Sequence, residues 1–181
     1  MLQEVLFAGF GGQGVVLGAT VTAHIAARCG NHVTIIPSYG NEQRGGSAYC
    51  DCKFVAPPDE IFDPRFEHPT VLIAMNDTSY HKYISAVAKD ALILLNADST
   101  DLTDPHVEGC TVVPVHCATL ADRAGSVKCA NFVMMGAMCK LKGFFTPEEA
   151  TEGIRHYMET NGKAKLAEMN VRAFMAGYDS V

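Results

Sequence analysis

Charged residues are scarce in this sequence of 181 residues, where they make up 19% against the roughly 25% of an ordinary soluble domain. The balance is acidic, with a formal net charge of −6, so the general basic character of a nucleic-acid-binding protein is missing. Apolar residues reach 48%, which excludes a disordered chain. We therefore expect a folded domain with no nucleic-acid partner, whose apolar content reflects either a large core or surface covered in an assembly.

Long hydrophobic runs are also missing. The apolar stretches VLIAM at 71–75 and ALILL at 91–95 fall far short of the roughly 18 residues that a membrane-spanning helix needs. The first residues, MLQEVLFAGFGGQG, contain an acid and no basic residue, which is unlike a secretory signal. We expect a cytoplasmic protein with no membrane partner.

Cysteine and histidine do not occur at the spacings of metal sites. The seven cysteines include no Cys-x-x-Cys pair, and the seven histidines include no His-x-x-x-His pair. We expect no metal, no iron–sulfur cluster and no catalytic residue on this chain. Cys50 and Cys52 alternate with polar residues in SAYCDCKF, which predicts that both thiols lie on the buried face of a strand.

Hydrophobic strands alternate with helical patterns along the whole chain. We expect strands at 4–10, 32–36, 47–54, 70–75, 91–97 and 110–115, and helices near 14–28, 77–89, 118–124, 131–142, 147–160 and 163–176. This order predicts a single α/β domain over residues 1–181, Rossmann-like, with a mostly parallel sheet and helices on both faces. The strand at 47–54 follows its predecessor without a helix, so we expect it at a sheet edge or antiparallel.

Asn170 falls within the apolar stripe of the last expected helix. A buried amide needs hydrogen-bond partners, because leaving its polar atoms unpaired costs about 1 to 3 kcal/mol. We expect Asn170 to be buried and to tie this helix to the backbone of a loop.

A glycine motif lies between the first expected strand and the first helix, where Gly9, Gly11 and Gly14 match G-x-G-x-x-G. Such a turn lets backbone N–H groups at a helix N-terminus approach an anion such as a pyrophosphate. A dinucleotide site would also need an acid at the end of the second strand, which instead ends in Pro37 and Ser38. An anion site, a stand-alone nucleotide-binding module and a tight turn without a ligand all remain open.

A second glycine-rich segment, SYGNEQRGG, follows the second strand, and we expect it beside the first at the carboxyl end of the sheet. The guanidinium of Arg44 is suited to hold a carboxylate or phosphate by two hydrogen bonds, or it pairs with Glu42 and orders the loop. The candidate ligand-binding residues from the two segments are Gly11, Gly12, Gln13, Gly14, Ser38, Tyr39, Gly40, Glu42, Arg44 and Gly45.

Five segments in this order make nearly the whole sequence similar to the gamma subunit of 2-oxoacid:ferredoxin oxidoreductases. They are GFGGQG, PSYGNEQRGG, VLIAMND, ANFVMMGAM at 130–138 and Asn170-x-x-Ala173-x-x-x-Gly177. The form SYG-x-E-x-RGG resembles the 2-oxoglutarate and branched-chain 2-oxoacid members more than the pyruvate or indolepyruvate members. Cys50, Asp51 and Cys52 depart from the small and β-branched residues usual in the next strand.

The resemblance implies the non-cofactor subunit of a complex that oxidatively decarboxylates a 2-oxoacid, most closely 2-oxoglutarate to succinyl-CoA. It implies that electrons leave to ferredoxin or a similar acceptor, and that alpha, beta and delta subunits are the partners. Thiamine diphosphate and the [4Fe–4S] clusters would belong to those subunits. The glycine segments of this chain would face coenzyme A at the interface, and the isolated chain would be inactive.

Overall fold

The computed structural model describes residues 1–40, 46–101, 103 and 105–181. Within these residues six strands form one sheet, in the order β2-β3-β1-β4-β5-β6. They are β1 (Gln3–Phe10), β2 (His32–Tyr39), β3 (Ser47–Val55), β4 (Val71–Ala74), β5 (Leu92–Asn96) and β6 (Thr111–Val115). The strands β1, β4, β5 and β6 pair in parallel, whereas β3 is antiparallel to both of its neighbours. The predicted mostly parallel sheet is confirmed.

Of the two alternatives expected for the strand at 47–54, a sheet edge or an antiparallel direction, the second is confirmed. β3 does not lie at an edge: it lies between β1 and β2, and the edge strands of the sheet are β2 and β6. The reason is that β3 is covered on both faces. Cys50 and Cys52 are fully buried on one face, as predicted, and Asp51 and Lys53 are only 2% and 3% exposed on the other.

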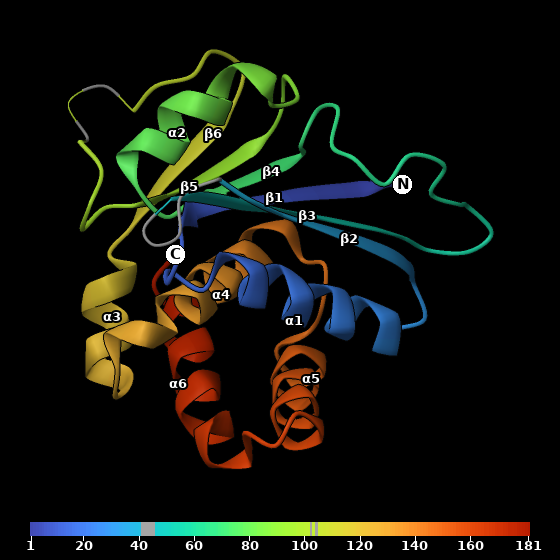
Figure 1. The fold of residues 1–181 in the computed structure, drawn as a ribbon, viewed down its shortest axis with the longest axis vertical. Helices are drawn as coiled ribbons and strands as arrows, with labels where there is room; N and C mark the ends of the chain where they lie inside the picture. The colour runs from blue at the N-terminus through green and yellow to red at the C-terminus, as the bar shows by residue number, and fades with distance from the viewer. Residues whose placement is uncertain (41–45, 102, 104) are drawn as a thin grey trace.

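Helices cover both faces of the sheet, as predicted, although very unequally (Figure 1). They are α1 (Val15–Arg28), α2 (Asp77–Tyr83), α3 (Cys117–Ala124), α4 (Ala130–Lys142), α5 (Pro147–Thr160) and α6 (Ala167–Tyr178), with the 3-10 turns η1 (Ile84–Ala86), η2 (Val127–Cys129) and η3 (Ala164–Leu166). The larger apolar core contains residues of α1, α3, α4, α5 and α6, whereas the smaller one contains α2 alone among the helices. None of the described helices is long and apolar enough to span a membrane.

The helix expected at 77–89 is shorter than predicted. α2 ends at Tyr83 and continues only as the turn η1. The backbone then becomes extended at Val87, and the Ala88 N–H donates to the Pro69 carbonyl instead of to a helical partner. This contact leads the chain directly into β5.

The crossing of α4 and α6 explains why Gly136 and Gly177 are glycines. A Cβ atom on Gly136 would lie 1.9 Å from the Phe174 carbonyl oxygen, and one on Gly177 would lie 1.9 Å from the Val133 carbonyl oxygen. Since these obstacles are backbone atoms, only glycine permits the two helices to approach so closely. Asn170 on α6 is buried as predicted, but its Oδ1 accepts from the Cys129 thiol at 3.0 Å rather than from a loop backbone.

Candidate functional site

The glycine loop, residues 9–14, joins β1 to α1 at the carboxyl edge of the sheet. Gly12 and Gly14 have φ angles of 98° and 73°, in the left-handed region that favours glycine. Gly14 is the N-cap of α1, and among the described residues no side chain caps this helix and no acid lies in its first turn. The first N–H groups of α1 therefore lack side-chain partners, and the positive end of the helix favours an anion.

The loop uses part of its own hydrogen-bonding capacity. The Gly11 N–H donates to the Gly46 carbonyl at 3.0 Å, and the Gln13 N–H donates to the Phe10 carbonyl at 3.1 Å. Within the described part of the chain, the N–H groups of Gly12 and Gly14 have no acceptor. The donors free for a ligand are thus these two and the first turn of α1, a smaller set than the sequence predicts.

A hollow of about 260 Å³ lies at the N-terminus of α1, on the side of β2. It is lined by Phe10, Gly11, Gly12, Gly14, Val15, Val16, Leu17, Tyr39 and Ala48. Tyr39 is 66% exposed and so presents its ring to the solvent at this hollow. The structure therefore brings two residues of the second glycine-rich segment to the glycine loop, Tyr39 at the hollow and Gly46 through its carbonyl.

The other predicted residues of that segment are placed differently. Ser38 precedes Tyr39 on β2, and its side chain leaves the opposite face of the strand. Gly40 is exposed and donates its N–H to the Ser47 carbonyl at 2.7 Å. Glu42, Arg44 and Gly45 lie outside the described residues, so their predicted role stays a prediction.

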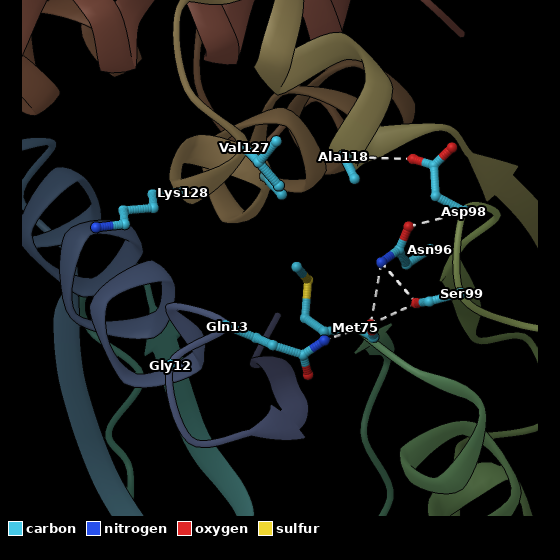
Figure 2. A pocket seen from close by; sticks show the side chains of 10 residues that line it. Gly12, Gln13, Met75, Asn96, Asp98, Ser99, Ala118, Val127 and Lys128 are labelled. Atoms are coloured by element: carbon cyan, nitrogen blue, oxygen red, sulfur yellow. Dashed lines mark hydrogen bonds between the residues drawn. The ribbon is translucent and has the colours of Figure 1, made fainter. Parts of the chain in front are cut away.

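A second cavity, of about 310 Å³, lies on the other side of Gly12, where β1, β4 and β5 end (Figure 2). Its lining consists of Gly12, Gln13, Met75, Asn96, Asp98, Ser99, Ala118, Val127, Lys128 and Ala130. Sequence reasoning missed most of these residues. The polar residues Asn96, Asp98 and Ser99 at the end of an apolar strand were the available signal, because such residues gather at the carboxyl edge of a parallel sheet.

Asp98 is fixed by the start of α3. Its carboxylate accepts from the Ala118 N–H at 2.8 Å, the Thr119 N–H at 3.1 Å and the Thr119 hydroxyl at 2.9 Å, and it contacts His116 Nδ1 at 3.1 Å. Burial pushes the pKa of Asp98 upward, but these donors outweigh it and hold the pKa below its usual value. The carboxylate is therefore committed to holding α3 and is not free as a base.

Gln13 lines the second cavity, and its terminal amide is hydrogen-bonded to groups of the neighbouring loops. Its Oε1 accepts from the Phe10 N–H at 2.7 Å and from Asn76 Nδ2 at 2.8 Å, while its Nε2 donates to the Met75 carbonyl at 3.1 Å. Figure 2 shows this amide between the glycine loop and the end of β4. Its surroundings are those of a residue that joins two loops.

Metal and thiol chemistry have no support in the described part of the chain. Among those residues no three His, Cys, Asp or Glu side chains form a group that could hold a metal ion. Burial raises the pKa of Cys50 and of Cys117 to about 12, so both thiols stay protonated and unreactive at neutral pH.

Comparison with known proteins shows that residues 4–180 match the family described as pyruvate ferredoxin/flavodoxin oxidoreductase. The chain is 33% identical over 175 residues to the ketoisovalerate oxidoreductase subunit VorA of Methanothermobacter thermautotrophicus, covering 96% of this chain but only 35% of that protein. It is 29% identical over 184 residues to the 2-oxoglutarate synthase subunit KorC of Methanocaldococcus jannaschii, covering 99% of this chain and 94% of KorC. The chain thus spans about a third of the first relative and nearly all of the second.

Solved structures support the fold. The gamma subunit of a keto/oxoacid ferredoxin oxidoreductase from Geobacter sulfurreducens superposes with a TM-score of 0.80 at 23% identity, covering 98% of this chain and 96% of that one. The 2-oxoglutarate:ferredoxin oxidoreductase from Magnetococcus marinus, solved with 2-oxoglutarate, coenzyme A and succinyl-CoA bound, gives a TM-score of 0.82 at 20% identity. This second match covers 99% of the present chain and 31% of the larger one.

Proposed function

The chain belongs to the pyruvate ferredoxin/flavodoxin oxidoreductase family, and we propose that it is the gamma subunit of a 2-oxoacid:ferredoxin oxidoreductase complex. The observation that carries the proposal is the family match over residues 4–180, together with similarity to KorC along nearly the full length of both chains. In such a complex a 2-oxoacid and coenzyme A give an acyl-CoA and CO₂, and two electrons pass singly to ferredoxin. Thiamine diphosphate and [4Fe–4S] clusters on the partner subunits would supply the carbon and electron chemistry.

We propose that the role of this chain within the complex is binding, since Asp98, the acid that lines the second cavity, is engaged with the start of α3. What the described residues offer is the uncapped N-terminus of α1, with the free N–H groups of Gly12 and Gly14. A helix N-terminus with left-handed glycines is suited to a diphosphate. We infer that the diphosphate of coenzyme A binds there, with Tyr39 beside it. The solved relative that holds coenzyme A supports this choice of ligand.

For the 2-oxoacid we propose 2-oxoglutarate, with ketoisovalerate as the competing substrate. The SYG-x-E-x-RGG form of the second glycine-rich segment favours these two classes. The chain is 33% identical to a relative named for ketoisovalerate and 29% identical to one named for 2-oxoglutarate, so the choice between the two acids is left to experiment.

The test is anaerobic purification of the protein with whatever accompanies it in its source, followed by assay. We expect companion subunits that contain thiamine diphosphate and iron–sulfur clusters. We also expect 2-oxoacid-dependent reduction of ferredoxin that requires coenzyme A, with 2-oxoglutarate the fastest of 2-oxoglutarate, ketoisovalerate, indolepyruvate and pyruvate.

The isolated chain should be colourless and inactive. Stoichiometric iron and sulfide on the isolated chain, or turnover of a 2-oxoacid without partners, would refute the proposed role. Tight binding of NAD or FAD by the chain alone would favour a stand-alone nucleotide-binding module instead.

A further inference from the structure

We propose that Gln13 is the residue that positions the glycine loop, and that its side chain serves neighbouring loops and does not contact the ligand. The inference rests on the proposed function only for the identity of the ligand, coenzyme A. Three independent features of the described residues carry it: the orientation of the Gln13 amide, the connections of that amide beyond β4, and the space left by two glycines of the motif.

The orientation of the Gln13 amide is dictated by backbone groups. The Phe10 N–H can only donate and the Met75 carbonyl can only accept, so the atom facing Phe10 must be Oε1 and the atom facing Met75 must be Nε2. Asn76 must then face Oε1 with Nδ2, which leaves its Oδ1 to accept from the Ser79 N–H at 2.8 Å and cap α2. Both ends of the Gln13 amide therefore have partners inside the protein, Oε1 with two donors and Nε2 with one acceptor.

The Met75 carbonyl extends this connection to the next loop. It also accepts from Asn96 Nδ2 at 3.1 Å and from the Ser99 hydroxyl at 3.1 Å, as the dashed lines of Figure 2 show. Asn96 Oδ1 in turn accepts from the Asp98 N–H at 3.1 Å. The loops that follow β1, β4 and β5 are thus joined into one hydrogen-bonded unit at the edge of the second cavity.

The first glycine of the motif makes room for this amide. A Cβ atom on Gly9 would lie 2.8 Å from Gln13 Oε1 and 2.9 Å from Met75 Cβ. The last glycine makes room for another amide, since a Cβ atom on Gly14 would lie 2.8 Å from Asn131 Cγ. Asn131 Nδ2 donates to the Gly14 carbonyl at 3.2 Å and so holds the same loop from α4.

Two of the motif's glycines are therefore explained by the side chains of Gln13 and Asn131, without any ligand. The residues left to meet a ligand are Gly12 and the free N–H of Gly14 with the first turn of α1. Gln13 acts on that ligand only through the loop, because it ties the loop to the end of β4 and so sets where these N–H groups point.

The test compares Gln13→Met with the wild type in the assembled complex and in the full chain. Methionine keeps the length of the side chain and removes both hydrogen-bonding ends. We expect hydrogen–deuterium exchange of Phe10, Gly11, Gln13 and Met75, whose N–H groups are hydrogen-bonded, to be at least tenfold faster in the variant. We expect the KM for coenzyme A to rise about tenfold, with kcat at saturating coenzyme A and the KM for the 2-oxoacid unchanged.

The matched control is Thr146→Ala, which removes the N-cap of the remote helix α5 and should destabilise the chain without changing the KM for coenzyme A. If Gln13→Met does not fold, Asn76→Asp replaces it. This variant keeps the cap of α2 but places an acceptor against Gln13 Oε1, and it should give the same two changes to a smaller degree.

The outcomes separate the inference from the proposed function. Faster exchange in Gln13→Met, combined with a wild-type protein that never responds to coenzyme A, would support the positioning role and refute coenzyme A as the ligand. A raised KM with unchanged exchange would mean that Gln13 contacts the ligand directly, and the positioning role would be wrong. Unchanged exchange together with an unchanged KM would overturn it as well.

Discussion

The two ends of the parallel strands are held by opposite kinds of polar group. At the carboxyl end, neutral amides and a hydroxyl join the loops around the Met75 carbonyl. At the amino end, charged side chains do so: Glu4 Oε2 lies 3.6 Å from Lys53 Nζ, and both are at least nine-tenths buried. Because the amides are neutral, they do not cancel the positive potential at the N-terminus of α1, which stays available to an anion. Buried charges, in contrast, make the free energy of unfolding depend on pH.

The charged end binds the segment between β3 and β4. Lys53 Nζ donates to the Asp63 carbonyl at 3.0 Å, and Glu4 Oε1 accepts from the Glu67 N–H at 2.5 Å. Burial raises the pKa of the adjacent Asp51 to about 6, with the Glu4 carboxylate adding to the rise, although the Phe66 N–H and Lys53 oppose it. This end of the molecule therefore stabilises a loop at an electrostatic cost that the amides around the Met75 carbonyl avoid.

Lys53→Met should give the largest effect, since it removes the cation from the charged end and leaves Glu4 and Asp51 buried without it. Breaking a buried ion pair by removing one partner costs about 3 to 5 kcal/mol. Urea unfolding at pH 7 should show a loss of this size. The double variant Lys53→Met with Glu4→Gln should recover part of the loss, and a double variant no more stable than the single one would show that the pairing is not its cause.

The pH dependence should be next in size. Because the pKa of Asp51 is higher in the folded chain than in the unfolded one, its contribution to stability is complete below the unfolded value and is lost as pH rises through about 6. A shift of this size corresponds to about 2 to 3 kcal/mol. Unfolding free energies measured from pH 4 to pH 7 should therefore fall relative to those of Asp51→Asn, whereas parallel pH profiles would assign the dependence to other groups.

At the neutral end, Gln13→Met should cost about 1 to 3 kcal/mol, because it leaves the Phe10 N–H and the Met75 carbonyl with fewer partners. None of the groups concerned titrates, so the loss should be the same at pH 5 and pH 8. Chemical denaturation at both pH values measures it. If the loss of stability in Gln13→Met changed with pH, the carboxyl and amino ends of the strands would be electrostatically coupled, and the distinction between a neutral and a charged end would be wrong.

Lys128→Gln should give the smallest change. Lys128 is exposed at the mouth of the second cavity, so the substitution should alter stability by less than about 0.5 kcal/mol. An exposed cation near a bound anion is worth up to about 1 kcal/mol, so the KM for coenzyme A should rise by a factor of about five at most. A rise of a hundredfold would place the anion at Lys128 and not at the glycine loop.

The sequence was informative where a local rule decides the structure. Period-two and helical patterns located almost every element. The sequence was uninformative for side chains whose contacts are made with residues distant in the sequence. The pattern of the strand predicts a solvated Lys53, because it does not show that Glu4 lies beside it. Asn170 accepts a hydrogen bond from the Cys129 thiol, whose position depends on the packing of α3, α4 and α6.

The glycine motif was located correctly, but its parts were assigned by analogy with anion sites in general. Gln13 was expected to bind the ligand because it lies among the glycines. Its inward orientation depends on the Met75 carbonyl, which is 62 residues away in the sequence. A motif therefore predicts the place of a loop in the fold better than it predicts which way the side chains of that loop point.

Hydrogen–deuterium exchange of the assembled complex, with and without coenzyme A, tests most directly whether the glycine loop is the site of this ligand. Coenzyme A should slow the exchange of Gly12, Gly14 and the first turn of α1 by at least tenfold, while the region around Lys53 and Asp63 keeps its rate. Saturating coenzyme A that leaves residues 12–17 unchanged, or that protects a different edge of the sheet, would contradict the proposed site.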